Sequence, residues 1–485
     1  MKTLKFLMAA VVALAMTSCS DDDNSPSIEG ELSIYINGEH YVINLSDNGP
    51  TNLTTLCTEF DADVTVDNSS DFQSIIIDGQ TVKGGKCKVP VSKINADTQI
   101  KIAYLKNGHP GQVLLNTLHS GIPKLNVNGQ AVAKGDFYLS FVYNRLIMKV
   151  NNKGEVLFYR YEPRTVTDPN DVSGWWDFKK HVTEDGTVYY SYHANDPKFA
   201  SRLMMGYDPG MRVILDDHYK PLKTIHLKAS LDGYVGDGEP LDGHDFYLFS
   251  LNHYIVSAYL DRPISDRNAK VSYLQEVLDG EVVFDWWSTS IPDMETWANP
   301  NFDTSYDYVH FNSLQVLPDG NLLCSFRAVC SVLKINRTDG SMMWRIDGAG
   351  LDPKYAFFGQ HYVTLHDDNT LTVFDNGNGH AGPNGQPIPD TRLLRLTINP
   401  ETGEVLGGGN ILPASKMYFT QACGSFQIVN TGYVAGWGIP GDETSEYNRL
   451  VKEFDAAGHE IFSLSLNGSY TEAFFNASYR CAKYE

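Results

Sequence analysis

Long apolar segments and an excess of positive charge are both missing from most of this 485-residue chain. Beyond the N-terminal segment, no stretch approaches the roughly 18 consecutive apolar residues that a membrane-spanning helix needs. The chain carries 38 Lys and Arg against 59 Asp and Glu, a formal net charge of −21. Because phosphate backbones are bound by basic surfaces, this balance argues against a nucleic-acid partner. An anionic substrate would need a local cationic pocket that acts against the overall field.

The N-terminal segment has the features of an export signal. Two early lysines precede an apolar run over residues 6–16, which is short for a buried anchor helix, the alternative interpretation. Residues 16–19, Met-Thr-Ser-Cys, resemble a bacterial lipobox, and the acidic run after them resembles the tag of exported Bacteroidota lipoproteins. We therefore expect a lipoprotein signal peptide over residues 1–18 and lipidation of Cys19. Residues 19–30 would be a tether that touches the membrane only through its acyl chains, in the periplasm or at the outer-membrane surface.

Cysteine is scarce, with seven in the whole chain, and six remain after the one at the cleavage site. An even number is typical of an oxidising compartment, where disulfides form. Cys324 and Cys330 stand in what reads as one strand, which if straight would hold them roughly 20 Å apart, beyond disulfide reach. A bridge there requires a bend and is left open. The pairings that we expect are Cys57 with Cys87 and Cys423 with Cys481.

Residues 31–118 show short alternating apolar runs that are separated by hairpin dipeptides. Asn37-Gly38 and Asp78-Gly79 follow such runs, and both pairs favour two-residue turns between antiparallel strands. We therefore expect a small N-terminal β-sandwich module in this segment.

The rest of the chain, residues 120–485, repeats. A strand, a turn and a second strand recur about 60 residues apart, and a second recurring turn lies between them. Two hairpins in each repeat give four strands, and helical periodicity is lacking. This pattern predicts an all-β protein whose main domain is a six-bladed β-propeller, since the units of a β-sandwich array would be nearer about 100 residues. The six hairpins begin at Leu146, Val213, Leu274, Leu333, Leu394 and Val451.

Three histidines stand at the same place in three successive repeats. His244, His310 and His361 each open an apolar strand that ends in the same kind of turn. Equivalent positions in a radial repeat converge on its axis, so three imidazoles would surround one point. The plainer interpretation, a core hydrogen bond for each histidine, does not explain the shared register.

Three imidazoles could hold zinc, but no carboxylate stands beside them at a telling spacing, and no metal is expected. Arg327, in the same repeat as His310, would repel a cation. Its guanidinium instead offers paired donors to a planar or tetrahedral anion. The cluster therefore favours an oxyanion.

These stretches resemble the bacterial arylsulfate sulfotransferases, periplasmic enzymes that use no adenylyl-sulfate cofactor. The similarity covers residues 120–485 and is strongest over residues 240–380. The N-terminal module has no such match. The stretches that carry the resemblance are Asp242-Gly243-His244-Asp245-Phe246, His310-Phe311-Asn312-Ser313, Phe357-Phe358-Gly359-Gln360-His361 and Phe374-Asp375-Asn376-Gly377.

The resemblance implies transfer of a sulfuryl group from a phenolic sulfate to a phenolic acceptor, with no cofactor. His361 would be the nucleophile, which becomes sulfated in a ping-pong mechanism and passes the group to a second phenol. The remaining groups would stabilise the sulfuryl oxygens and move a proton to and from the phenols. Relatives are often dimers, so a homodimer is compatible with the resemblance. The residues implied to hold the sulfuryl group are His244, His310, Asn312 and Arg327, with Thr420 a weaker candidate.

The chain also departs from the family pattern beside the expected pocket. Ala328 follows Arg327 where a histidine is expected, and Tyr308-Val309 stands where a tryptophan-containing run is usual. Both differences bear on substrate choice and rate more than on reaction type. Aromatic residues that could line the pocket, although core packing is the plainer role of each, are Tyr308, Phe357, Phe358 and Tyr418.

Three other functions stay open from the residues alone. An aryl-sulfate hydrolase of the formylglycine type would need a Cys or Ser followed by x-Pro-x-Arg, a string that this sequence lacks. A non-catalytic surface propeller that binds sulfated glycans or phenols would keep Arg327 but would not need His361. A metalloenzyme built on the three histidines is the third.

Overall fold

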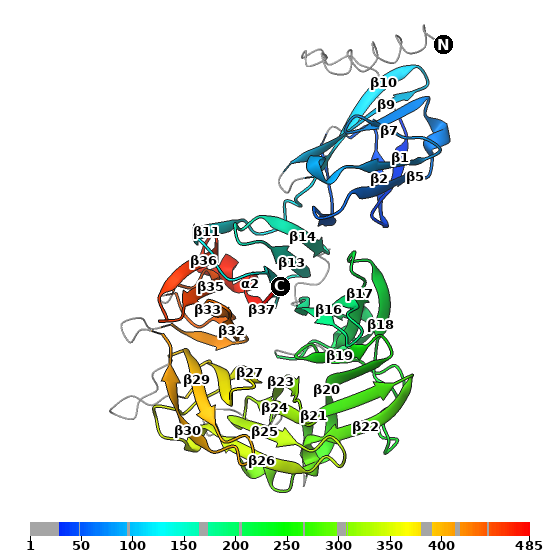
Figure 1. Ribbon diagram of the computed structural model, residues 1–485. Helices are drawn as coiled ribbons and strands as arrows, with labels where there is room; N and C mark the ends of the chain where they lie inside the picture. The colour runs from blue at the N-terminus through cyan, green and yellow to red at the C-terminus, as the bar shows by residue number, and fades with distance from the viewer. Residues whose placement is uncertain are drawn as a thin grey trace. The chain divides into compact units, whose positions relative to one another are not determined.

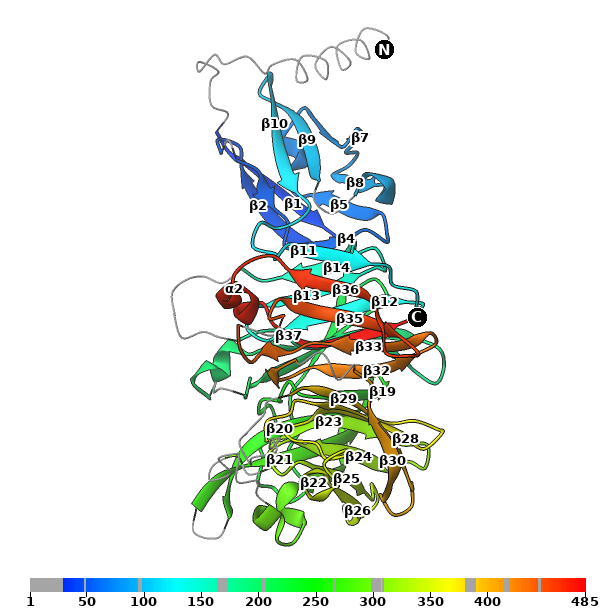
Figure 2. The ribbon, with the colours of Figure 1, turned by 90° about the vertical axis from the view of Figure 1, so that its left-hand side faces the viewer.

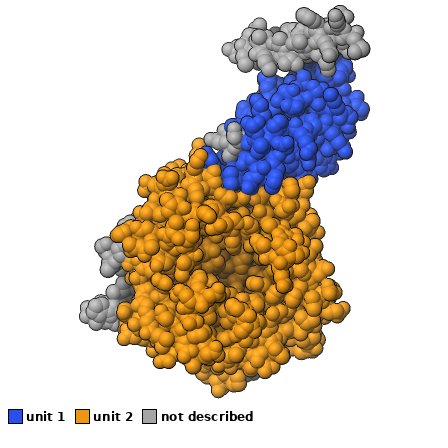
Figure 3. Space-filling model, viewed as in Figure 1, with its two compact units in different colours: residues 1–122, 155–163 blue, residues 123–154, 164–485 orange. Residues whose placement is uncertain are grey.

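Two compact units divide the chain, one of residues 1–122 with 155–163 and one of residues 123–154 with 164–485 (Figure 3). The regular secondary structure of both is almost entirely β-strand, which confirms the all-β prediction at that level. Within the described ranges, no helix is long and apolar enough to cross a membrane. The expected signal peptide and Cys19 lie outside the described residues. The computed structural model describes residues 29–47, 49–94, 98–163, 173–202, 206–264, 267–297, 307, 309–379, 390–412, 418–443 and 446–485.

Unit 1 contains two β-sheets, in the strand orders β2-β1-β5-β8 and β3-β10-β9-β6-β7, with β9 and β10 side by side in Figure 2. The predicted hairpin turns are present: φ is 52° and 90° at Asn37 and Gly38, and 47° and 82° at Asp78 and Gly79. Left-handed pairs of this kind form type I′ turns, which match the twist of the flanking strands. The strands are β1 (Glu31–Ile36), β2 (Glu39–Asn44), β3 (Thr51–Asn52), β4 (Thr55–Cys57), β5 (Ala62–Val66), β6 (Ser74–Ile77), β7 (Gln80–Thr81), β8 (Lys86–Val89), β9 (Gln99–Lys106), β10 (His109–Asn116) and β14 (Val156–Tyr161).

Unit 2 is a series of antiparallel sheets, four of which consist of four strands in chain order: β15 to β18, β19 to β22, β23 to β26 and β27 to β30. Its strands are β11 (Leu125–Gly129), β12 (Asp136–Phe141), β13 (Leu146–Val150), β15 (Trp176–Val182), β16 (Val188–Asn195), β17 (Gly210–Leu215), β18 (Pro221–Ile225), β19 (Phe246–Ser250), β20 (His253–Ile264), β21 (Arg267–Leu278), β22 (Glu281–Trp287), β23 (Phe311–Val316), β24 (Leu322–Phe326), β25 (Ser331–Ile335), β26 (Met342–Asp347), β27 (His361–Leu365), β28 (Thr370–Asp375), β29 (Arg392–Ile398), β30 (Val405–Asn410), β31 (Thr420–Ala422), β32 (Ser425–Val429), β33 (Gly432–Gly436), β34 (Ile439–Pro440), β35 (Arg449–Asp455), β36 (Glu460–Leu466) and β37 (Ser478–Tyr484). One short α-helix, α2 (Tyr470–Phe475), is present in the described part of this unit.

The sheets of unit 2 are arranged around a common centre, and the strands that open them, such as β19, β23 and β27, lie nearest to it (Figure 1). Figure 3 shows a hollow at this place on the face of the unit. Five predicted hairpins are antiparallel pairs: β17 with β18, β21 with β22, β25 with β26, β29 with β30, and β35 with β36. The first predicted hairpin coincides with strands β13 and β14. A closed six-bladed propeller stays a prediction.

The two ends of unit 2 are joined by strand pairing. The C-terminal strand β37 pairs with β12, and β36 pairs with β11 (Figure 2). These pairs link segments that lie more than 300 residues apart in the sequence, as Asp136↔Tyr484 shows. Leu139 of β12 is completely buried and stands opposite Cys481 of β37. The packing of this sheet therefore holds the beginning and the end of the unit together.

The cysteines differ from their predicted arrangement, since no disulfide joins those in the described part of the chain. Cys324 lies in β24 and Cys330 directly precedes β25, so the segment predicted as one strand is a hairpin. The chain bends at Cys330, where φ is 45°. Most of these cysteines are buried. The predicted pairings that are wrong are Cys57 with Cys87 and Cys423 with Cys481.

Replacing Leu139 by Ala should lower the free energy of unfolding of unit 2 by about 2–5 kcal/mol, because it leaves a cavity in the sheet that joins the two ends. Urea denaturation monitored by tryptophan fluorescence measures this change. Val182→Ala, at a side chain that is 63% exposed, should change the free energy by less than about 0.5 kcal/mol. Equal effects of the two variants would contradict a special contribution from the joining sheet.

Candidate active site

The three predicted histidines stand at the same place in three successive sheets. His244 and His310 precede β19 and β23, and His361 is the first residue of β27. These strands open their sheets and lie near the centre of unit 2 (Figure 1). The backbone is left-handed at His310 (φ 51°) and at Tyr362 (φ 48°), and the strand register is irregular beside both. Backbone strain of this kind clusters at functional sites.

His244 and His310 form an edge-to-face pair with their ring centroids 4.9 Å apart. Nδ1 of His244 is 2.6 Å from Oδ2 of Asp242, and Nδ1 of His310 is hydrogen-bonded to Asp307. Burial lowers the pKa of His310, an effect that the charges of His244 and Arg327 increase and that of Asp307 opposes. Each imidazole is therefore oriented by a carboxylate, and its other ring nitrogen is directed away from that carboxylate.

These carboxylates correct the expectation that none lies beside the histidines. Asp242 is two residues before His244 and Asp307 is three before His310, and turns at the strand starts bring each pair together. Burial would raise the pKa of Asp307, but His310 and Arg327 bring it below its usual value. Gly243 is needed between the first pair, because a Cβ there would lie 2.8 Å from the rings of His193 and Trp176.

Aromatic rings enclose this histidine pair. Tyr259 lies 5.4 Å from His244 and 5.5 Å from His310, centroid to centroid, while Trp176 lies 5.4 Å from His244 and Tyr207 5.8 Å from His310. A cavity of about 160 Å³ is lined in part by Tyr207, Tyr259 and Asp242, which contact the pair, although neither imidazole is among its described lining residues. Its volume suits a single aromatic ring.

His361 is held as a neutral imidazole with its proton on Nδ1. The amide nitrogen of Asn376 donates to the carbonyl oxygens of Thr420 (2.9 Å) and Cys423 (3.1 Å). This fixes the Asn376 oxygen toward His361, whose Nδ1–H donates to it over 2.7 Å. Nε2 is then the acceptor and lies 3.2 Å from the backbone nitrogen of Cys423. Burial places the pKa of His361 well below its usual value and the charge of Arg327 lowers it further, while Asn376 partly opposes them.

The positive charge of Arg327 acts on both His310 and His361. The backbone N–H of Arg327 donates to the carbonyl oxygen of His310 over 2.8 Å, and its guanidinium contacts the carbonyl oxygen of Gln421 at 3.4 Å. Burial lowers its pKa, while the carboxylate of Asp307 raises it. The structure thus brings together the histidines and the arginine that the sequence singles out.

Asn312 and Thr420 are both completely buried and linked to this cluster. The amide nitrogen of Asn312 donates to the carbonyl oxygen of Gln360 over 2.7 Å, and its Oδ1 has no hydrogen-bond partner among the described residues. The hydroxyl of Thr420 accepts from Arg449 over 3.1 Å, and its carbonyl oxygen holds Asn376. Thr420 is therefore linked to His361 by hydrogen bonds through Asn376.

The aromatic residues singled out in the sequence have other places. Phe357 is in the hydrophobic core with Val363, and Tyr418 packs against Trp437, with centroids 4.7 Å apart. Tyr308 lies outside the described residues, and Phe358 donates its backbone N–H to Asp375. The rings around the histidines come instead from Trp176, Tyr207 and Tyr259, which no motif in the sequence marks.

The chain matches the family model described as "Arylsulfotransferase (ASST)" over residues 198–465. No curated protein matches the chain. Among solved structures, a protein of unknown function from Bacteroides caccae aligns at 12% identity over 72% of this chain and 98% of that one, with a TM-score of 0.41. A catalytically inactive virginiamycin B lyase from Staphylococcus aureus aligns at 11% identity over 84% and 98%, with a TM-score of 0.34. At these TM-scores, neither bears on the fold or the function of this chain.

Asn376→Asp should raise the pKa of His361, because a carboxylate acceptor favours the protonated ring that burial and Arg327 disfavour in the wild type. NMR titration of the ring nitrogens measures this. The wild-type ring should stay neutral as the pH falls through about 6.5, the pKa of an ordinary histidine, and the variant ring should gain its proton at higher pH. Asn410→Asp, at an amide that accepts two backbone N–H bonds on the fourth strand of the same sheet, should leave His361 unchanged. A wild-type ring that is half protonated at pH 6.5 would contradict the described environment.

Proposed function

The chain belongs to the arylsulfotransferase family, and we propose that it transfers a sulfuryl group from a phenolic sulfate to a phenol by a ping-pong mechanism in which His361 is sulfated. The family supports aryl sulfotransferase activity in general, with phenolic sulfates and phenols as the classes of substrate. The hydrogen bonds of His361 support the finer mechanism. They leave the ring neutral, with its proton on Nδ1 and its lone pair on Nε2, next to the guanidinium of Arg327.

In the first half-reaction, Nε2 gives up the hydrogen bond that it accepts from the backbone N–H of Cys423. Its lone pair then forms an N–S bond while the S–O bond to the aryl group breaks. The electron pair of that bond leaves with the aryl oxygen as a phenolate. The imidazole gains positive charge while its Nδ1–H stays in place, so its hydrogen bond to Asn376 strengthens. A depressed pKa keeps His361 unprotonated and therefore nucleophilic at neutral pH.

In the second half-reaction, a phenol oxygen forms the new S–O bond and the N–S electron pair returns to Nε2. One proton goes to the departing phenolate in the first half, and one leaves the acceptor phenol in the second. We assign these transfers to His244 and His310, whose Nδ1 atoms are each bound to an aspartate. The cavity of about 160 Å³ beside Tyr207, Tyr259 and Asp242 would hold the aryl ring.

The three oxygens of the sulfuryl group need donors that are in place before the reaction. Arg327, His244 and His310 would supply them, and Asn312, whose amide nitrogen donates to the carbonyl oxygen of Gln360, would add its second N–H. Thr420 would contribute through Asn376, which it holds. A buried guanidinium with paired donors suits an anion in a protein whose formal charge is −21.

The position of the site and its compartment are parts of the same proposal. We propose that unit 2 is a six-bladed β-propeller with the histidines on its axis, which the sheets around a common centre support (Figure 1). Export with lipid attachment at Cys19 is proposed from the sequence of residues 1–19 alone.

Incubation with 4-nitrophenyl sulfate and no acceptor should add one SO₃ group to the peptide that contains His361, because the ring proton is on Nδ1 and the lone pair on Nε2 can exchange the N–H of Cys423 for sulfur. Intact-mass and peptide mass spectrometry at alkaline pH measure this gain. Addition of a phenol should remove the group and give the phenyl sulfate. His361→Asn should abolish both steps.

His366→Asn is the matched control, since His366 follows the same strand and bonds to Thr372. It should keep wild-type transfer. Nitrophenol release that does not depend on the acceptor would indicate hydrolysis, and binding without release would indicate the non-catalytic propeller. A modified residue other than His361 would overturn the assignment of the nucleophile.

Asp307→Asn should slow turnover of phenyl sulfate by about 100-fold but that of 4-nitrophenyl sulfate much less, because a poor leaving group needs the proton that His310 supplies. Steady-state rates with the two donors measure the difference. Asp339→Asn, in an exposed turn, is the control and should change neither rate. An equal loss with both donors would argue against proton transfer by His310.

A further inference from the structure

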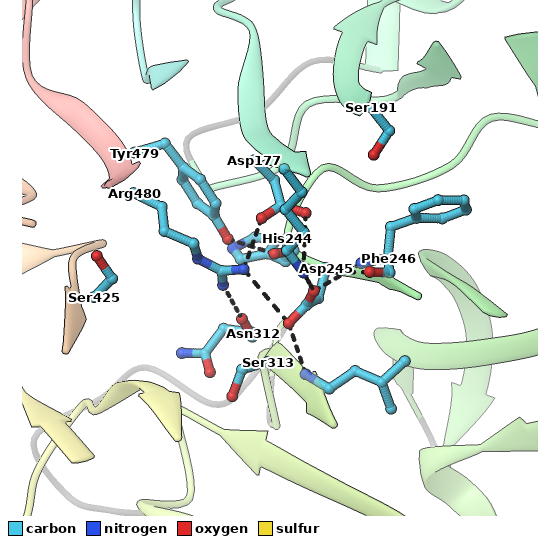
Figure 4. Close-up of polar contacts among 12 residues, drawn as sticks. Asp177, Ser191, His244, Asp245, Phe246, Asn312, Ser313, Ser425, Tyr479 and Arg480 are labelled. Atoms are coloured by element: carbon cyan, nitrogen blue, oxygen red, sulfur yellow. Dashed lines mark hydrogen bonds and ion pairs between the residues drawn. The ribbon is translucent and has the colours of Figure 1, made fainter. Parts of the chain in front are cut away.

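Two neighbouring residues of the C-terminal strand β37, Tyr479 and Arg480, contact the segments that carry the three histidines. Both are buried, and Figure 4 shows the Arg480 guanidinium directed toward Asp177, Asp245 and Asn312. Each histidine of the cluster comes from a different sheet. The relative placement of the three rings therefore depends on groups that bridge those sheets.

Arg480 contacts all three histidine-bearing segments. Its Nη1 is 3.5 Å from Oδ2 of Asp245, the residue after His244. Its Nη2 donates to the carbonyl oxygen of Asn312 over 3.1 Å, two residues after His310. Its guanidinium lies 4.7 Å from the ring centroid of Tyr362, the residue after His361. One planar group therefore touches the backbone or the next side chain of every segment that supplies an imidazole.

Tyr479 adds a direct bond to one of these segments. Its hydroxyl donates to the carbonyl oxygen of His244 over 2.8 Å (Figure 4). Its ring stacks on Trp176 with centroids 5.0 Å apart, and Trp176 in turn contacts the His244 ring. The position of His244 is thus fixed from its backbone and from its ring.

Arg480 is itself held firmly. Nη1 is 2.7 Å from Oδ1 of Asp177, a completely buried carboxylate that also binds Arg212 at 3.0 Å. Burial would raise the pKa of Asp177, but Lys179, Arg480 and Arg212 together bring it below its usual value. Charged groups that are paired in this way inside a protein have defined positions, because any displacement leaves a buried charge without its partner.

We propose that Tyr479 and Arg480 are positioning residues, which set the mutual geometry of His244, His310 and His361. The proposal rests on the proposed function for its effect on the rate, but not for its effect on the rings. It assigns a role to the strand that joins the two ends of unit 2: the pairing of β37 with β12 also aligns the site. A misplacement of about 1 Å at a reacting centre is enough to lower a rate by about 100-fold.

Two mild substitutions test the proposal. Arg480→Lys keeps a positive charge but loses the planar fork that reaches Asp177, Asp245 and Asn312 together. Tyr479→Phe keeps the ring and loses only the donor to His244. Each should lower kcat for 4-nitrophenyl sulfate with a phenol acceptor by about 10-fold to 100-fold, while KM for the donor changes by less than about threefold. Each should also shift the ring-nitrogen NMR resonances of His244.

Lys483→Met is the matched control, because it breaks a buried ion pair of the same strand. Nζ of Lys483 is 2.7 Å from Oε2 of Glu453 and 2.8 Å from Oδ1 of Asn152, so its partners lie outside the histidine segments. This variant should lose thermal stability at least as much as Arg480→Lys does. It should nevertheless keep the wild-type kcat and the His244 resonances.

The outcomes separate the two proposals. Folded Arg480→Lys and Tyr479→Phe variants with wild-type kcat and resonances would overturn the positioning role, as would an equal loss of kcat in Lys483→Met. If the wild type transfers no sulfuryl group, the proposed function fails, and the His244 resonances alone decide the positioning role. Loss of folding in Arg480→Lys leaves Tyr479→Phe as the deciding variant.

Discussion

The hydrogen bond from His361 to Asn376 is the interaction on which the proposed chemistry of this site depends. The amide of Asn376 cannot turn, because its nitrogen already donates to the carbonyl oxygens of Thr420 and Cys423. The ring must therefore carry its proton on Nδ1, and its lone pair must be on Nε2. In the proposed mechanism, His361 with a fixed tautomer and a low pKa would need no base of its own, unlike the serine of a Ser–His pair.

Much of the site could be predicted because a radial repeat converts sequence register into spatial convergence. The shared place of His244, His310 and His361 at strand starts was enough to predict a cluster. In the structure, the rings of His244 and His310 are in contact, and both act electrostatically on His361. The aspartates were missed for a local reason. A carboxylate two or three residues from a histidine has no fixed direction in an extended chain, and only a turn such as the left-handed one at His310 brings them together.

Other features could not be read from the sequence because they arise from contacts between distant segments. Tyr479 and Arg480 lie more than 100 residues from His361, and nothing in the C-terminal strand marks them as neighbours of the site. The cysteines show the same limit. Their even number suggested disulfides, but Cys423 and Cys481 each have their own buried surroundings, and a hairpin separates Cys324 from Cys330.

The arrangement of charge explains how a protein with a net charge of −21 could accept an anion at a buried place. The positive charge of Arg327 faces Asp307, so it does not remain available in full to a sulfate. In the proposed reaction, Asp307 would partly offset the burial that disfavours a proton on His310. An arriving aryl sulfate and such a proton would neutralise each other. In the proposed reaction, binding of the anionic substrate would favour the protonated histidine that supplies the proton to the leaving phenolate. Aspartates that hold the histidines are therefore compatible with an anion site.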